Sequence, residues 1–92
     1  MTVRWTTAAS KDYAAAHAYI AEGNLRAANA VMDRILEGIA ALERHPEMGR
    51  KGRVSGTREL VVAPYVVAYR MRQGVIEILA IIHGARKWPD WF

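Results

Sequence analysis

The sequence contains no cysteine and only three histidines. Without cysteine there can be no disulfide framework and no thiolate metal ligand. His17, His45 and His83 lie far apart in the chain and lack the spacing of metal ligands. We therefore expect no metal site, and nothing in the sequence demands a cofactor.

Long apolar segments are also missing. No stretch approaches the roughly 20 apolar residues that a membrane-spanning helix needs. The N-terminus lacks the basic-then-apolar pattern of a signal peptide. We expect a soluble, cytoplasmic protein without a membrane partner. A chain of 92 residues is expected to form one domain, 1–92, with a single core.

Positive charge is concentrated in the second half of the chain. The net charge is +4. Residues 1–49 hold five basic and six acidic side chains, whereas residues 50–92 hold eight basic and three acidic ones. An acidic partner or a nucleic acid is expected to bind the second half.

The first half predicts a short strand and two helices. Val3–Thr6 alternates apolar and polar side chains, and Thr6 or Thr7 can cap a following helix over 8–21. Gly23 is expected to end that helix in a left-handed conformation, and Asn24 to cap a second one over 25–44. Apolar residues recur every three or four positions. The predicted inward positions are Ala9, Tyr13, Ala16 and Ile20, then Leu25, Ala28, Met32, Ile35, Ile39 and Leu42.

The second half predicts a cationic loop over 47–58 and three antiparallel strands. The strands are expected over 58–63, 65–72 and 75–83, joined at Pro64 and at Gln73-Gly74. The order β-α-α-β-β-β indicates an α+β fold in which a helical hairpin packs on one face of a small, mostly antiparallel sheet.

Simple alternation along the strands assigns residues to the two faces. On the last strand, it predicts that Ile76, Ile78, Ala80 and Ile82 face the helices. It places Val66, Ala68, Arg70, Arg72, Glu77, Leu79, Ile81 and His83 on the open face, with Leu60 as a further candidate there. An open face that mixes apolar and cationic side chains is typical of a protein-binding surface.

Three motifs in order carry a family resemblance: Pro46-Glu47-Met48-Gly49-Arg50, Gly56-Thr57-Arg58-Glu59-Leu60 and His83-Gly84-Ala85-Arg86. With the elements around them, over about residues 3 to 88, the chain resembles the RelE/ParE superfamily of small bacterial toxins, and its ParE branch most. The resemblance implies a type II toxin neutralised by direct binding of a ParD-like antitoxin. ParE-type toxins inhibit DNA gyrase, whereas RelE-type relatives cut messenger RNA on the ribosome.

The ribonuclease alternative requires a proton shuttle and cations around the scissile phosphate. The candidate catalytic residues are Arg58, Arg70, His83 and Arg86. Arg72 would join the arginines in the cationic clamp, and Glu59 is the alternative to His83 as the proton shuttle. Two departures from that branch favour gyrase inhibition and no enzymatic activity. The strand after Arg58 reads ELVVA without a cation, and the chain end offers tryptophans, which have no proton to transfer.

Partner contacts are expected from one set of residues: Arg50, Arg53, Arg58, Arg70, Arg72, Arg86, Trp88 and Trp91. An amphipathic antitoxin tail in a groove between the helices and the sheet would meet these cations with its acidic flank. Direct nucleic-acid binding is compatible with the charge but not required. For His83 the preferred interpretation is that a ring N–H donates to a backbone carbonyl and fixes the turn after the strand. For the whole protein, a plain interaction module is a third alternative. The tail from Trp88 to Phe92 is expected to fold back on the sheet or to contact a partner.

Overall fold

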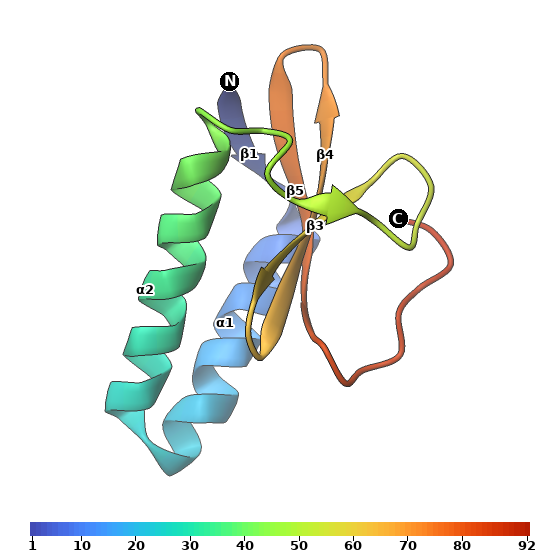
Figure 1. The fold of residues 1–92 in the computed structure, drawn as a ribbon. Helices are drawn as coiled ribbons and strands as arrows, with labels where there is room; N and C mark the ends of the chain where they lie inside the picture. The colour runs from blue at the N-terminus through green and yellow to red at the C-terminus, as the bar shows by residue number, and fades with distance from the viewer.

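The computed structural model describes residues 1–92. Two helices pack on one face of a five-stranded sheet, and the C-terminal tail runs along the other side of the sheet (Figure 1). The elements are β1 (Thr2–Trp5), α1 (Thr7–Gly23), α2 (Leu25–Leu42), β2 (Arg50–Lys51), β3 (Arg58–Val62), β4 (Tyr65–Arg72) and β5 (Val75–His83). The predicted α+β fold is confirmed, with β2 added inside the segment expected to be a loop.

The helices begin where their capping residues predicted. The Thr6 hydroxyl accepts a hydrogen bond from the Ala9 N–H, and the Asn24 side chain accepts one from the Ala27 N–H. The end of α1 differs from the prediction, because Gly23 remains helical and Asn24 breaks the helix in an extended conformation with φ −165°. No helix is long and apolar enough to cross a membrane.

The predicted inward stripes form the helical side of the core. All of the α2 stripe is buried except Leu25, which is 59% exposed at the first position of the helix. On α1 the two alanines are fully buried while Tyr13 and Ile20 are half-buried. Burying alanine lets α1 approach the sheet closely.

The sheet order is β1-β5-β4-β3-β2, with β1 parallel to β5 and the other pairs antiparallel. The β4–β5 hairpin turns at Gln73 and Gly74, which have φ of 52° and 78°. Two consecutive positive φ values are the geometry of a two-residue hairpin turn, so the predicted turn is confirmed.

A bulge in β5 overturns part of the face assignment. Ala68 pairs with Ala80, but the next residue of β4, Tyr69, pairs with Ile78, which leaves Leu79 as the extra residue. Beyond the bulge every side chain changes face. Ile81, predicted on the open face, packs in the main core, and Ala80 and Ile82, predicted toward the helices, lie on the opposite side.

The sheet consequently has an apolar cluster on each face. The main core lies between the helices and the sheet and includes Leu60, which was expected as a candidate for the open face. A smaller cluster on the other face contains Ala68, Leu79 and Ala80, covered by Ile82, Trp88 and Phe92. The tail therefore folds back on the sheet, as one of the two expectations held.

Candidate functional site

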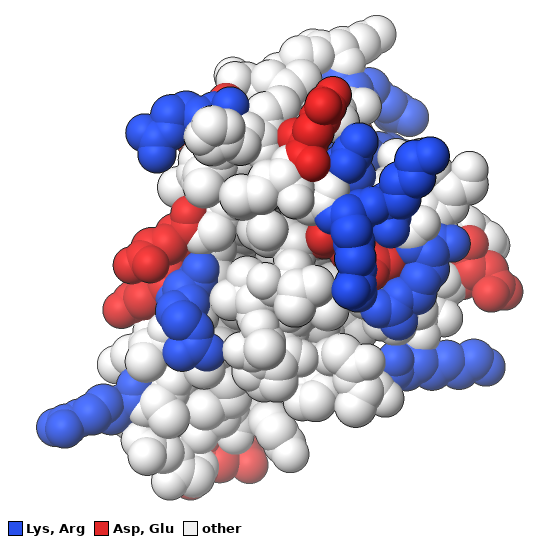
Figure 2. All heavy atoms as spheres, in the orientation of Figure 1, with Lys and Arg blue, Asp and Glu red and all other residues white.

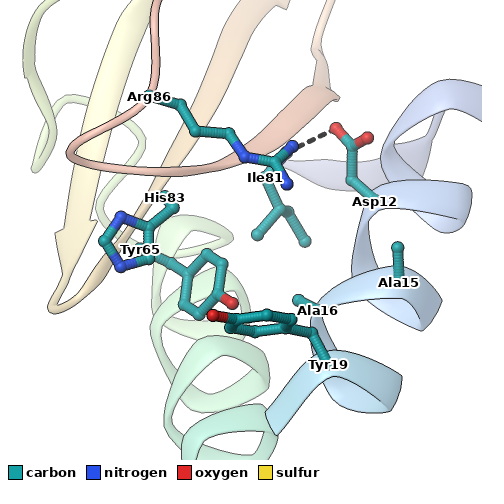
Figure 3. Close-up of a pocket in the computed structure, with 8 residues that line it drawn as sticks. All are labelled: Asp12, Ala15, Ala16, Tyr19, Tyr65, Ile81, His83 and Arg86. Atoms are coloured by element: carbon teal, nitrogen blue, oxygen red, sulfur yellow. Dashed lines mark hydrogen bonds between the residues drawn. The ribbon is translucent and has the colours of Figure 1, made fainter.

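A cavity of about 330 Å³ opens between α1 and the end of β5 (Figure 3). Its lining residues are Asp12, Ala15, Ala16, Tyr19, Tyr65, Ile81, His83 and Arg86. The Asp12 carboxylate accepts a hydrogen bond of 3.0 Å from the Ile81 N–H, which ties α1 to β5. This hydrogen bond fixes one wall of the cavity.

Hydrogen-bond donors surround the mouth of this cavity. The hydroxyl groups of Tyr19 and Tyr65 point toward one another, and the Arg86 side chain points toward Asp12 (Figure 3). The rings of Tyr65 and His83 meet edge to face at 5.4 Å. His83 Nδ1 accepts a hydrogen bond of 3.1 Å from the Ala85 N–H, so Nε2 carries the proton of the neutral ring. His83 thus shapes the turn after β5, as the preferred interpretation held, but as an acceptor.

The α1–β5 cavity combines these donors with an apolar floor. Ala15, Ala16 and Ile81 supply apolar surface, while Arg86 supplies the positive charge. Such a lining suits an apolar side chain next to an acidic one on a bound protein segment.

A buried carboxylate organises the cations of the β2–β3 region. Glu59 is 2% exposed. It accepts hydrogen bonds from Arg50 Nη2 at 2.9 Å, from the Arg53 N–H at 2.8 Å and from Arg53 Nε at 3.3 Å. Burial acts to raise the pKa of Glu59, but the hydrogen bonds from Arg53 and Arg50 outweigh it, and the pKa lies below its usual value. Arg50 and Arg53 are therefore held in place from inside the protein.

A second buried carboxylate, Glu77, binds two arginines across neighbouring strands. Arg70 Nε donates to it at 2.8 Å, and Arg4 of β1 pairs with its other oxygen. The hydrogen bond from Arg70 is the main cause of a pKa of Glu77 below its usual value. Arg70 is consequently committed to a structural ion pair on the open face of the sheet.

The cations of this region are visible as a group on the surface. Figure 2 shows Lys and Arg side chains gathered on the side of the molecule that carries β2 and the following loop. The group includes Arg50 and Arg53, whose side chains remain 56% and 45% exposed despite their pairing with Glu59. They can therefore still meet an acidic partner.

Arg58 has a structural role that differs from those of its neighbours. Its guanidinium donates to the carbonyl oxygens of Gly49, at 2.7 Å, and of Glu47, at 3.3 Å. It pairs in register with Tyr69, on the helix side of the sheet. Tyr69 also holds this loop: its hydroxyl donates to the Pro46 carbonyl at 2.7 Å and accepts from the Gly49 N–H at 2.9 Å. Apart from the Pro46–Arg50 motif, nothing in the sequence indicated this network.

The structure does not bring the candidate catalytic residues together. The prediction that His83 shares one face with Arg70 and Arg72 is wrong, because the bulge in β5 turns His83 toward α1. Arg58 lies on the helix side near the far end of β4, while His83 and Arg86 line the α1–β5 cavity. Of the four candidate catalytic residues, only His83 and Arg86 line the same cavity.

The tail places its three aromatic residues differently. Trp88 and Phe92 pack against the sheet, whereas Trp91 is 78% exposed. The Arg53 guanidinium lies 3.9 Å from the centre of the Trp88 ring, a cation–π contact. Among the expected partner-binding residues, Arg72, Arg86 and Trp91 are exposed, and their side chains make no hydrogen bond or ion pair within the chain.

Comparisons with known proteins agree with the fold. Residues 3–88 match the family model of the ParE toxin of the type II toxin–antitoxin system parDE. The chain is 40% identical over 90 residues to the putative toxin Y4kP of Sinorhizobium fredii, covering 96% of this chain and 93% of that protein. It is 33% identical over 84 residues to toxin RelE2 of Caulobacter vibrioides, covering 91% and 96% of the two chains.

A solved structure supports the same relationship. A chain of the chromosomal ParDE toxin–antitoxin system from P. aeruginosa superposes with a TM-score of 0.78 and 26% identity, covering 90% of this chain and 95% of that one. The fold and these matches define a toxin of the RelE/ParE superfamily. Within that superfamily, the chain belongs to the ParE toxin family of type II toxin–antitoxin systems.

Proposed function

We propose that this ParE-family toxin inhibits DNA gyrase in the cytoplasm and is neutralised by a ParD-like antitoxin that binds it directly, the whole chain acting as one domain. The observation that carries the choice of target is the separation of His83 from Arg70 by the β5 bulge. Proton transfer and phosphate stabilisation must act on the same bond, so residues on opposite faces of a sheet do not form one catalytic centre.

The engagement of the arginines supports the same choice. Arg58 is bonded to two backbone carbonyls and Arg70 to a buried carboxylate. A cation whose donors are used inside the protein has fewer left for the developing charge on a phosphate. The resemblance to ParE toxins then implies gyrase as the target, and ribosome-dependent RNA cleavage, the activity of RelE-type toxins, is the alternative.

For the antitoxin we propose the α1–β5 cavity as a docking site. An acidic side chain of the antitoxin would pair with Arg86, and an apolar neighbour would pack on Ala15, Ala16 and Ile81. In this proposal, Arg86→Glu weakens binding of the antitoxin at least about tenfold, as expected when an interfacial charge pair is reversed. Arg26→Glu, an equal charge change on an exposed α2 residue outside the cavity, is the matched control and leaves the affinity unchanged.

Induction in a bacterial host tests the function. We expect growth arrest with filamentous cells and an induced DNA-damage response, both reversed by co-expression of the antitoxin. Rapid loss of translation with cleaved messages would establish the ribonuclease instead. Unchanged growth, with the protein present and folded, would contradict a toxic activity altogether.

A further inference from the structure

The open face of the sheet contains a notch that holds an aromatic ring. Two alanines, Ala68 and Ala80, stand directly opposite one another in the β4–β5 register, with Leu79 of the bulge beside them. Trp88 of the tail packs against this cluster beside Ile82 and Phe92, and the Arg53 guanidinium lies 3.9 Å from the centre of the Trp88 ring. We interpret the small side chains as the floor of a site for one ring and the guanidinium as its roof, and we call this site the notch.

The notch is prepared independently of the tail. Glu59 pairs with Ala68 in the β3–β4 register, so its carboxylate lies on the same face and next to the floor. It holds Arg53 through the backbone N–H and the side chain, at 2.8 Å and 3.3 Å. The roof therefore stays in place whether or not a ring lies below it.

Trp88 fits the apolar floor but not the polarity of the notch. Its Nε1 atom is buried and finds no hydrogen-bond acceptor. A buried, unpaired N–H disfavours the seated state by about tenfold or more relative to a ring without one. The tail beyond β5 forms neither helix nor strand, and backbone hydrogen bonds hold it only at Gly84 and Arg86. Trp88 is thus a replaceable occupant.

We propose that the notch over Ala68 and Ala80 binds a phenylalanine side chain of a partner protein, flanked by acidic residues, which displaces Trp88. The missing acceptor indicates the class of ligand. A phenyl ring has no polar edge, whereas a nucleobase would leave several edge groups unpaired at this floor. Acidic flanks follow from the exposed cations at the rim, where Arg50 and Arg53 both contact the single buried carboxylate of Glu59 and so leave an excess of positive charge. This inference is independent of gyrase inhibition.

The test uses the full chain and three probes. These are the peptide acetyl-Asp-Glu-Phe-Glu-Asp-amide, the same peptide with alanine in place of phenylalanine, and a five-residue oligothymidylate. Binding is followed by the indole N–H resonance of Trp88 in ¹⁵N–¹H spectra, assigned by its loss in Trp88→Phe. We expect the phenylalanine peptide to shift this resonance to that of a solvent-exposed indole, and the two control probes to leave it in place.

Variants test whether Trp88 competes with the peptide for the notch. In variants that lack Trp88, binding is followed by the backbone resonances of Ala68 and Ala80. Trp88→Ala empties the notch and is expected to bind the phenylalanine peptide about tenfold more tightly, because the competing seated state is gone. Trp88→Phe, a better occupant, binds it more weakly, and Trp91→Ala, the matched change at the exposed tryptophan, binds it as the parent chain does. Ala80→Val in the Trp88→Ala background abolishes binding; if that chain does not fold, Arg53→Gln must weaken binding instead.

Equal affinity of the Trp88→Ala variant and the parent chain would overturn the proposal. So would equal binding of the alanine peptide, or displacement of Trp88 by the oligothymidylate.

Discussion

The buried hydroxyl group of Tyr69 makes two hydrogen bonds to the loop after α2, and a single substitution removes both without changing the ring. Tyr69 is fully buried, and its oxygen accepts from the Gly49 N–H while it donates to the Pro46 carbonyl. Tyr69→Phe keeps the ring and its packing. It removes both hydrogen bonds and leaves the buried Gly49 N–H without a partner.

The expected loss follows from these two bonds. A buried donor left unsatisfied costs about 1–3 kcal/mol, and the second bond adds about 1 kcal/mol. We expect Tyr69→Phe to lower the free energy of unfolding by about 2–4 kcal/mol. In a domain of this size, that corresponds to a decrease in Tm of about 10–30 °C.

Urea and thermal unfolding followed by circular dichroism measure the effect. Tyr19→Phe is the matched control, since Tyr19 is 72% exposed and should change the free energy by less than about 0.5 kcal/mol. Burial raises the pKa of Tyr69. The hydroxyl's contribution is therefore complete below about pH 10 and is lost as the pH rises through the raised pKa, so the two chains should converge there. A loss below about 0.5 kcal/mol for Tyr69→Phe would refute the role of this hydroxyl.

Three further changes test other parts of the account. Glu59→Gln should lower the free energy of unfolding by about 1–3 kcal/mol at neutral pH; because the pKa of Glu59 is lowered, this difference should shrink as the pH falls below about 4 in denaturation titrations. Gly49→Ala would place a Cβ 2.6 Å from the Tyr69 hydroxyl and should lower Tm, whereas Gly23→Ala, with nothing within 4 Å, should not. His83→Ala should retain growth inhibition as a stable protein, and complete loss of toxicity would revive the acid–base proposal.

Local patterns in the sequence were sufficient to predict the architecture. The three-and-four spacing on α2 and the caps at Thr6 and Asn24 depend on residues close in the chain, and both were confirmed. The hairpin turn at Gln73-Gly74 is equally local. The prediction that Gly23 ends α1 in a left-handed conformation was wrong. Asn24 ends the helix in an extended conformation, and its backbone N–H donates to the Ile20 carbonyl.

The face assignment failed where it depended on pairing between strands. Alternation predicts faces only while the register is unbroken, and the extra residue Leu79 breaks it. Nothing in the apolar run Ile78–Ile82 marks the position of a bulge, because every residue in it suits either face. The same shift places His83 and Arg70 on opposite faces of the sheet, so the predicted grouping of these two candidate catalytic residues was wrong.

The sequence predicted the positive charge of the site but not which carboxylates pair with its arginines. The excess of cations in the second half was evident, but their partners Glu59 and Glu77 are buried by tertiary contacts. The contact between Arg53 and Trp88 joins residues 35 positions apart and depends on where the tail folds back. Local sequence carries no information about such a contact.

Inhibition of DNA gyrase by the purified toxin is the most direct test of the central proposal. In a plasmid supercoiling assay with gyrase and ATP, we predict loss of supercoiling and accumulation of cleaved plasmid as the toxin concentration rises. Prior addition of the antitoxin should restore the activity. Full supercoiling at a large excess of folded toxin, with cleavage of messenger RNA on ribosomes by the same preparation, would contradict the proposal.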